Sequence, residues 1–247
     1  MKFDRSSGIL MNISSLPSKY GIGVFSDDVV KFGKFVLSCG AHYWQMLPLT
    51  TIGTGNSPYS GVSAFAGNFL YIDADKLVRD GVITAEDAKS TYYKGSMYTV
   101  DYATEYLSRR TILAKAVIKG YPKYKDEIDA YLLDNSWLVD YAEYMTLKEV
   151  NANTPWWQWN EKLKMHDRGA IDEAISKNRS TYEYYIYEQF VFDRQWREVK
   201  SSLNSMGISI IGDMPIYVSL DSSDVWSHQE MFDHLLRSNQ AVRLQHH

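Results

Sequence analysis

The sequence predicts an α/β protein with a parallel sheet and a long helical insertion between its second and third strands. Residues 8–13 and 43–49 are two apolar runs separated by one amphipathic stretch, which is the pattern of a strand, a crossover helix and a parallel strand. A third apolar run, residues 208–212, follows a second amphipathic stretch. Residues 76–179 between them carry long amphipathic segments with short polar breaks, which favours helices.

Length and composition limit the class of protein. The chain has 247 residues, enough for one sizeable domain or two small ones. Its net charge of −4 provides no basic surface for nucleic acid or an anionic membrane. The single cysteine, Cys39, cannot form an internal disulfide, which fits a reducing compartment. No apolar run approaches the roughly 18 residues that span a bilayer. These observations predict a cytoplasmic protein without nucleic-acid or membrane partners.

Each predicted element has a local signal. Residues 8–13 are expected to form a buried strand that ends before Leu16-Pro17. Ser26 is expected to cap a helix with Asp27 and Asp28 in its first turn, where the helix dipole favours acidic side chains. The helix should end at Gly40. Its apolar stripe, in which Cys39 should also be buried, is Val29, Phe32, Phe35 and Val36.

The later helices predict a division of the chain into four parts. Ser136 is a candidate cap for a helix that buries Val139, Ala142 and Met145. A second amphipathic helix ends at Gly207 and carries the apolar residues Ile186, Phe190, Trp196, Val199 and Leu203. Residues 1–75 are predicted to hold the first two strands, 76–179 a helical insertion, and 180–233 a helix and the third strand. Residues 234–247 form an atypical tail.

Three loops of unusual composition each follow one predicted strand: residues 14–25, 50–68 and 213–226. The carboxyl ends of parallel strands meet at one edge of the sheet, where active sites of α/β proteins are built. The chain is also rich in tyrosine and tryptophan, with 19 and seven residues against nine phenylalanines. Rings with an apolar face and a polar tip suit sugars, although most such rings fill cores. The loops therefore predict a ligand site.

Two residues in these loops are the main candidates for that site. Asp213 ends an otherwise apolar strand, where a carboxylate either binds substrate or pairs with a buried partner. Tyr59, in a loop stiffened by Pro58, either presents its ring and hydroxyl to a ligand or packs on the rim of the sheet. Asn68 is a ligand contact or a turn residue.

The third loop ends in the start of a predicted helix. Asp221 or Ser222 is expected to cap this helix. Trp226 is expected to pack in the interior rather than to stack on a sugar.

Other chemistries find little support. Residues 21–26 lie between a strand and a helix like a dinucleotide-binding loop, but Ser26 replaces the third glycine and no acidic residue ends the second strand. The six histidines show no metal-ligand spacing. With Cys39 in a helix stripe, no cysteine–histidine nucleophile is evident.

Several motifs in order resemble those of the amylomaltases, the bacterial 4-α-glucanotransferases and their plant disproportionating-enzyme relatives. The loop Asn56-Ser57-Pro58-Tyr59 and residues 63–68 look like the signature of that family. The resemblance extends from about Arg5 to about Phe232. Its other motifs are residues 5–10, 15–17, 20–23, 44–49, 192–196, 210–218 and 221–226.

The resemblance implies both a fold and a reaction. The fold would be a partial (β/α)8 TIM-type barrel, about three of eight strands, with a large, mostly helical insertion. Members of the family move α-1,4-glucan segments between maltooligosaccharides by a retaining mechanism, without a metal or organic cofactor. Tyr59 and Asp213 coincide with positions that contact the sugar, and Ser57 lies close to the glucan. Asn68 or Asn12 is a further candidate contact.

The resemblance also implies that the bond-breaking groups lie beyond His247. Retaining transfer needs two carboxyl groups about 5 Å apart. In the family the nucleophilic aspartate lies on the fourth strand and the acid/base glutamate on the fifth, and this chain is expected to end before both. The tail departs from the family pattern, as a frameshift, a truncated gene or a gene-call error would each produce.

The chain alone is therefore expected to be inactive. Three strands cannot close a barrel, so the sheet edges and apolar faces should be exposed. The protein should then dissolve poorly or depend on a complementing carboxyl-terminal fragment. The alternative is a non-catalytic α-glucan-binding protein.

Overall fold

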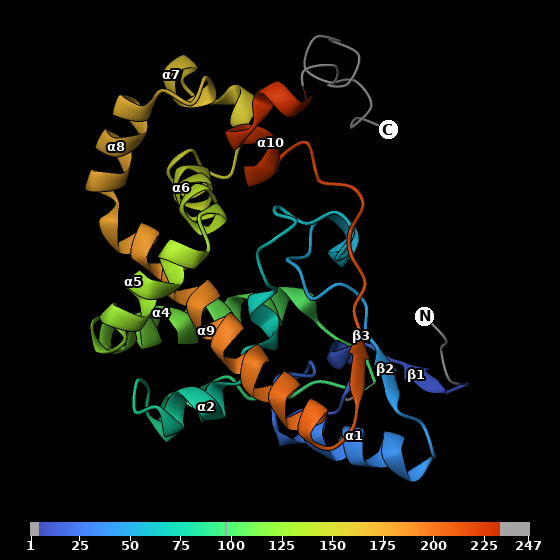
Figure 1. Cartoon of the computed structure of the whole chain (residues 1–247). Helices are drawn as coiled ribbons and strands as arrows, with labels where there is room; N and C mark the ends of the chain where they lie inside the picture. The colour runs from blue at the N-terminus through green and yellow to red at the C-terminus, as the bar shows by residue number, and fades with distance from the viewer. Residues whose placement is uncertain (1–4, 97, 233–247) are drawn as a thin grey trace.

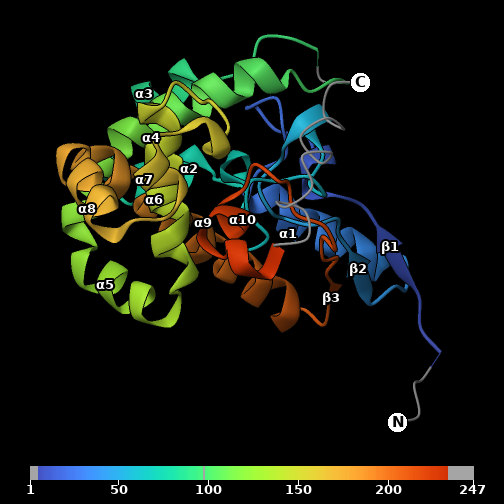
Figure 2. The same ribbon diagram turned by 90° about the horizontal axis from the view of Figure 1, so that it is seen from above.

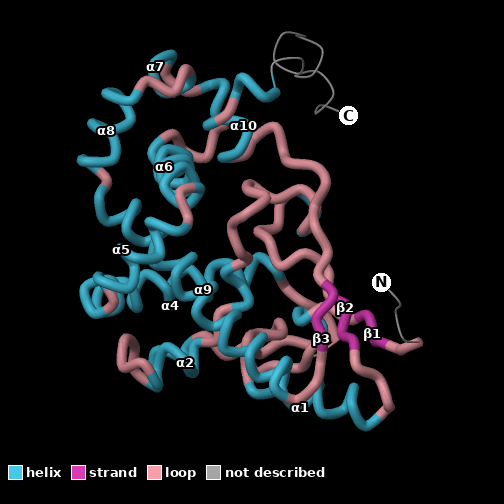
Figure 3. Tube along the Cα trace, viewed as in Figure 1, coloured by secondary structure: helices cyan, strands magenta, loops and turns pink. Residues whose placement is uncertain are grey.

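The computed structural model describes residues 5–96 and 98–232, so the tail predicted at 234–247 lies outside the described residues. The strands are β1 (Gly8–Leu10), β2 (Tyr43–Gln45) and β3 (Ser209–Ile211). They form one parallel sheet in the order β1-β2-β3, shown at the right of Figure 3. The predicted parallel sheet is confirmed, although each strand is shorter than its apolar run.

The two faces of the sheet have different environments. Ile9, Trp44 and Ile210 are aligned across the three strands and pack into a core with helices α1 and α9. The opposite face carries Leu10 and Ile211, whose side chains are 60% and 44% exposed. Alternate residues of a strand point to opposite sides of the sheet, and only one side is covered here. The strands are therefore not buried on both faces, and the exposed apolar face agrees with the expectation that three strands leave such a face uncovered.

Helix α1 (Asp27–Ser38) packs on the covered face of the sheet. The Ser26 side chain accepts a hydrogen bond from the Asp28 backbone N–H at 3.3 Å, which confirms the predicted cap. Gly40 follows the helix with a φ of +72°, a left-handed conformation that glycine adopts without strain. The predicted stripe is partly wrong, because Phe35 and Cys39 are exposed. Both lie outside the core in which Val29 and Val36 are buried.

After a long irregular stretch that follows β2, the segment up to β3 is mostly helical, in agreement with the predicted insertion (Figure 1). Its helices are α2 (Ala74–Arg79), α3 (Ala85–Ser90), α4 (Tyr102–Lys123), α5 (Lys125–Asp134), α6 (Trp137–Val150), α7 (Glu161–Lys164), α8 (Arg168–Lys177) and α9 (Arg179–Ser205). Helix α10 (Ser223–Ser227) follows β3. None of the described helices is long and apolar enough to cross a membrane.

Short 3-10 turns connect these elements. They are Ile13–Ser15, Thr54–Asn56, Phe69–Tyr71, Trp156–Gln158 and Gln229–Phe232.

Helix α6 departs from its prediction in two ways. Ser136 has helical backbone angles and makes no capping hydrogen bond with its side chain. Of the three residues expected to be buried, Ala142 is buried and Val139 and Met145 are half-buried. The stripe is shifted, because α6 contacts α8, α9 and α10 on different sides and buries a broad surface.

Helix α9 connects two hydrophobic cores in the described part of the chain. Its first half, including Ile186 and Phe190, packs in the helical core with α4 and α6. Its last turns, including Val199 and Leu203, pack against α1 and the sheet. Figure 2 shows the sheet at one side of the molecule and the stacked helices at the other, with α9 between them. The helix begins at Arg179, next to the predicted boundary between residues 179 and 180.

Candidate functional site

Tyr59 and Asp213, the two main candidates from the sequence, are in direct contact. Tyr59 lies in the loop after β2 and Asp213 in the segment after β3. The Tyr59 hydroxyl donates a hydrogen bond to Asp213 Oδ2 at 2.6 Å across 154 residues of sequence. Asp213 Oδ1 accepts from the Met214 backbone N–H at 2.8 Å. Parallel strands bring the two loops to the same edge of the sheet, as the sequence predicts.

The pair is accessible, and its tyrosine is protonated at neutral pH. Tyr59 is 41% exposed and Asp213 is also exposed. The hydrogen bond to Asp213, with a smaller contribution from lost hydration, raises the pKa of Tyr59 above its usual value near 10. The phenol therefore remains protonated at neutral pH. It offers one ring face and a hydroxyl next to a carboxylate that retains further acceptor capacity.

The loop that carries Tyr59 is held at its base and across its span. Thr50 forms an antiparallel bridge with Gly67, and the Thr50 hydroxyl donates to the Pro58 carbonyl at 3.1 Å. Ser57 Oγ accepts from the Tyr59 backbone N–H at 3.2 Å, so the serine shapes the turn immediately before the tyrosine. Ser57 is thus brought to the site, with its hydroxyl engaged in positioning Tyr59.

Two distant polar side chains fix the same loop to the helices. Gln189 of α9 accepts from the Gly67 N–H at 2.7 Å and donates to the Gly67 carbonyl at 3.0 Å. Asp224 of α10 accepts from the Ala64 N–H at 3.1 Å. Sequence reasoning missed both residues, because a polar residue on a helix gives no sign of a backbone partner more than 100 residues away.

Asn68 and Asn12 have local structural partners. Asn68 is buried, and its Oδ1 accepts from the Leu70 N–H at 3.1 Å, which caps a 3-10 turn. Asn12 caps the turn after β1 through Ile13 N–H and donates to the Tyr71 hydroxyl at 3.1 Å. Neither side chain is joined to the Tyr59–Asp213 pair by a hydrogen bond among the described residues. Sugar contact by either asparagine stays a prediction.

Of the two candidate caps for α10, Ser222 is the one the structure uses, through a hydrogen bond from the Val225 N–H. Asp221 instead accepts from the Tyr144 hydroxyl at 2.7 Å and from Lys148, both on α6. Trp226 is fully buried, which confirms that it packs in the interior. The segment from Asp213 to α10 runs upward beside the Tyr59 loop in Figure 1 and is tied to α6 at its far end.

The sequence matches the model of the 4-alpha-glucanotransferase family over residues 11–238. The chain belongs to this family. It is 38% identical to the 4-alpha-glucanotransferase of Aquifex aeolicus over 231 residues, covering 92% of this chain and 46% of the relative. It is 39% identical to the enzyme of the same name from Streptococcus pneumoniae, with the same coverage of both chains.

A solved structure gives the same result for the fold. The structure of this chain superposes on that of the amylomaltase from Streptococcus agalactiae in complex with acarbose. The TM-score is 0.88 and the sequence identity 37%. That match covers 92% of this chain and 46% of the amylomaltase. The chain thus spans about half the length of the relatives it matches. The three-stranded parallel sheet with its helical insertion corresponds to part of the amylomaltase fold.

Proposed function

We propose that these residues form the amino-terminal, sugar-binding part of a 4-α-glucanotransferase, which transfers α-1,4-glucan segments between maltooligosaccharides by a retaining mechanism. The observation that carries the proposal is the hydrogen bond between Tyr59 and Asp213 at the carboxyl edge of the sheet. Membership of the 4-alpha-glucanotransferase family and the fold shared with an amylomaltase that binds acarbose support it.

The chemistry of the pair fits a pyranose. Asp213 accepts hydrogen bonds from sugar hydroxyls, and a charged acceptor makes such bonds about twice as strong as a neutral one. The ring of Tyr59 offers an apolar surface to the C–H face of the sugar. Asn68 and Ser57 are both predicted to lie near the glucan; Ser57 shapes the turn before Tyr59, and Asn68 caps the turn that follows the loop. Asn68 acts from within the fold, through the turn that it caps.

Cleavage of the glycosidic bond requires more than this pair. A retaining mechanism uses two carboxyl groups about 5 Å apart, one as nucleophile and one as acid/base. Within the described part of the chain, Asp213 is the carboxylate that is hydrogen-bonded to Tyr59. We assign the nucleophile and the acid/base to a carboxyl-terminal portion of the protein, outside these 247 residues. No residue of this chain is assigned a catalytic role.

The exposed face of the sheet suggests where that portion binds. Leu10, Tyr43 and Ile211 leave apolar surface on the side of the sheet opposite α1 and α9. The outer edges of β1 and β3 pair with no strand among the described residues. Further strands added at these edges would extend the sheet toward the barrel that the sequence predicts and would cover this surface.

The second candidate is a glucan-binding protein without transferase activity. It is favoured by the Tyr59 site as the described residues form it, where Asp213 is the carboxylate bonded to Tyr59, since binding needs no second carboxyl group. The two functions differ in one readout: only the transferase releases glucose from maltotriose.

The test combines binding and transfer. Titration calorimetry with maltoheptaose should show binding to the chain, weakened about tenfold or more by Asp213→Asn and by Tyr59→Phe, because a hydrogen bond to a charged group contributes about 1.5–3 kcal/mol. Tyr98→Phe, at an exposed tyrosine, is the matched control and should bind like wild type. Equal affinity of all four proteins would refute the assignment of the site.

Transfer is measured as glucose released from maltotriose. The chain alone should release none, and addition of the carboxyl-terminal half of a 4-α-glucanotransferase should start the reaction. Binding without transfer in the presence of that half would favour the glucan-binding protein. Ordinary transfer rates by the chain alone would refute the assignment of the carboxylates.

A further inference from the structure

Away from the sugar site, three side chains with metal-binding chemistry come together. Asp140 and Glu143 lie on α6, and His166 lies in the turn between α7 and α8. One possible ligand atom from each residue lies within 4.8 Å of the other two. We propose that these three residues form a structural site for a divalent transition-metal ion, with Zn²⁺ as the ion that fits best.

The two carboxylates are arranged by helix geometry. Residues three apart on a helix lie on one face, so Asp140 and Glu143 both point toward the turn that holds His166. Glu143 is almost fully buried, with 3% of its side chain exposed. A buried carboxylate requires cations or hydrogen-bond donors around it. Its position therefore favours binding of a cation.

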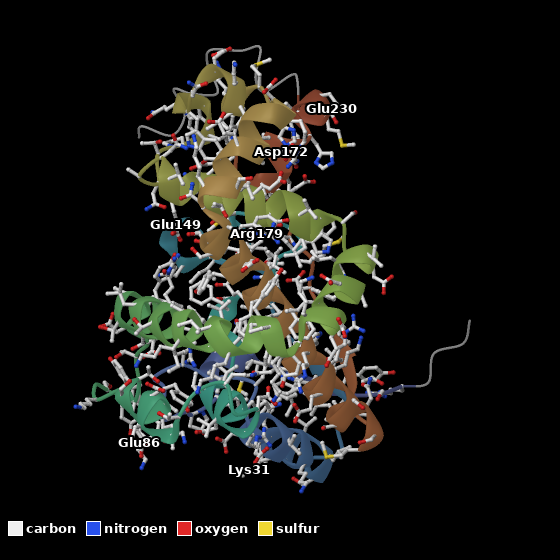
Figure 4. The ribbon with its side chains drawn as sticks, turned by 90° about the vertical axis from the view of Figure 1, so that its left-hand side faces the viewer. Lys31, Glu86, Glu149, Asp172, Arg179 and Glu230 are labelled. Carbon is white, nitrogen blue, oxygen red and sulfur yellow. The ribbon has the colours of Figure 1, made fainter. Side chains whose placement is uncertain are left out.

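Arg168 already contacts both carboxylate oxygens of Glu143 and leaves some of their acceptor positions unused. Its Nη1 donates to Oε2 at 2.9 Å and its Nη2 donates to Oε1 at 2.5 Å. A carboxylate has about four acceptor positions, two on each oxygen. One oxygen can thus bind a metal while Arg168 remains and orients the group, as outer partners of metal ligands do. Arg168 is also paired with Asp172, which is labelled on α8 in Figure 4.

His166 supplies the observation that separates this group from an acidic cluster. Its Nε2 is buried and has no hydrogen-bond partner among the described residues. A buried polar nitrogen without a partner is unfavourable, and a neutral imidazole nitrogen is a common metal ligand. The residue has a left-handed backbone with a φ of +57°, and its ring lies 4.4 Å from the ring of Trp226, centroid to centroid. These constraints hold the imidazole in place.

The ligand set selects the ion. One imidazole nitrogen and two carboxylate oxygens match Zn²⁺, which binds such atoms at about 2.0–2.2 Å with water as a fourth ligand. Tetrahedral bonds of that length place ligand atoms about 3.3 Å apart, so small side-chain rotations close the site. Ca²⁺ prefers six to eight oxygen ligands, and Mg²⁺ a nearly complete octahedron of them. The histidine and two carboxylates of this site match neither of these ligand sets.

The position indicates a structural role. The site links α6 to the turn against which Trp226 of α10 packs. Helix α6 also holds Asp221 at the start of α10 through Tyr144 and Lys148. A bound ion would stabilise this group of helices without contributing to the chemistry at Tyr59 and Asp213. No local motif indicates this site, because His166 lies 23 residues after Glu143 along the chain.

The test is metal binding by the metal-free 247-residue chain. Titration with ZnCl2 should show a component that His166→Ala and Asp140→Asn each weaken at least tenfold. Zn²⁺ should raise the Tm of wild type more than that of either variant, and Co²⁺ should give the visible absorption bands of a tetrahedral site. His228→Ala, at an exposed histidine, is the control and should behave like wild type.

The variants retain the other histidines, including those of the tail, so adventitious binding contributes equally to all the proteins. If His166→Ala impairs folding, Asp140→Asn still tests the site, because it preserves the shape of the side chain. The same zinc affinity in wild type and both variants would overturn the proposal. So would the absence of tetrahedral Co²⁺ bands in wild type.

Discussion

Replacement of Glu105 by glutamine should change how the stability of the protein depends on pH. Glu105 lies in the first turn of α4, with only 1% of its side chain exposed. Neither carboxylate oxygen has a hydrogen-bond partner among the described residues, and Arg109 Nη2 lies 4.0 Å away. Burial raises the pKa of Glu105 from 4.5 to about 7, with Arg109 acting in the opposite direction.

The sign and size of the effect follow from proton binding. Between pH 4.5 and about 7 the folded protein holds a proton on Glu105 that the unfolded chain has released, so stability is full below this range and falls as pH rises through it. Each pKa unit corresponds to about 1.4 kcal/mol. The loss is therefore about 3 kcal/mol between pH 4 and pH 8, a large part of the stability of a typical domain.

The assay is urea unfolding followed by tryptophan fluorescence at several pH values. Glu105→Gln should remove about 3 kcal/mol of the decline seen in wild type between pH 4 and pH 8, because glutamine does not titrate. Glu188, buried in α9, also has its pKa raised to about 7 by burial. Glu188→Gln should therefore remove a further part of the decline in stability between pH 4 and pH 8. If wild type and Glu105→Gln lose stability in parallel over this range, the burial argument for Glu105 is wrong.

Three further predictions concern the sugar-site loop and α1. Asp224→Ala should lower the free energy of unfolding by about 1–3 kcal/mol, because it leaves the Ala64 N–H without its acceptor. It should also weaken maltoheptaose binding more than Asp129→Ala, a control at the surface. Unchanged affinity would contradict the view that Asp224 holds the Tyr59 loop in place. Gly67→Ala should destabilise the protein by about 1–3 kcal/mol, because a Cβ at this position would lie 2.2 Å from the Phe192 ring. Adding Phe192→Leu to this variant should restore part of the lost Tm. If it does not, this clash is not the cause of the destabilisation. Ser26→Ala should cost about 1 kcal/mol through the lost helix cap, measured as a lower urea midpoint, and an unchanged midpoint would contradict it.

The elements that the sequence predicted well are those with a local signal. Ser26 and Gly40 mark the two ends of α1, and both act as expected because capping and left-handed turns depend on adjacent residues. The predictions that were wrong depend on how a helix packs against the rest of the protein. Cys39 and Phe35 were expected to be buried, but both are exposed. An apolar stripe in the sequence does not show how much of the helix surface its neighbours cover. Ser136 was expected to cap α6, although the chain enters that helix with helical backbone angles already formed.

The sequence by itself determined that the three strands run parallel, that helices are inserted between the second and the third, and that the loops carrying Tyr59 and Asp213 lie at one edge, because strand direction sends both loops there. Only the tertiary structure decided which polar groups hold that edge together. Gln189, Asp224 and Asp221 bind partners from 65 to 160 residues away along the chain. Asp140, Glu143 and His166 meet only where α6 packs beside the turn after α7. Such contacts depend on how whole helices pack, and no pattern of neighbouring residues encodes them.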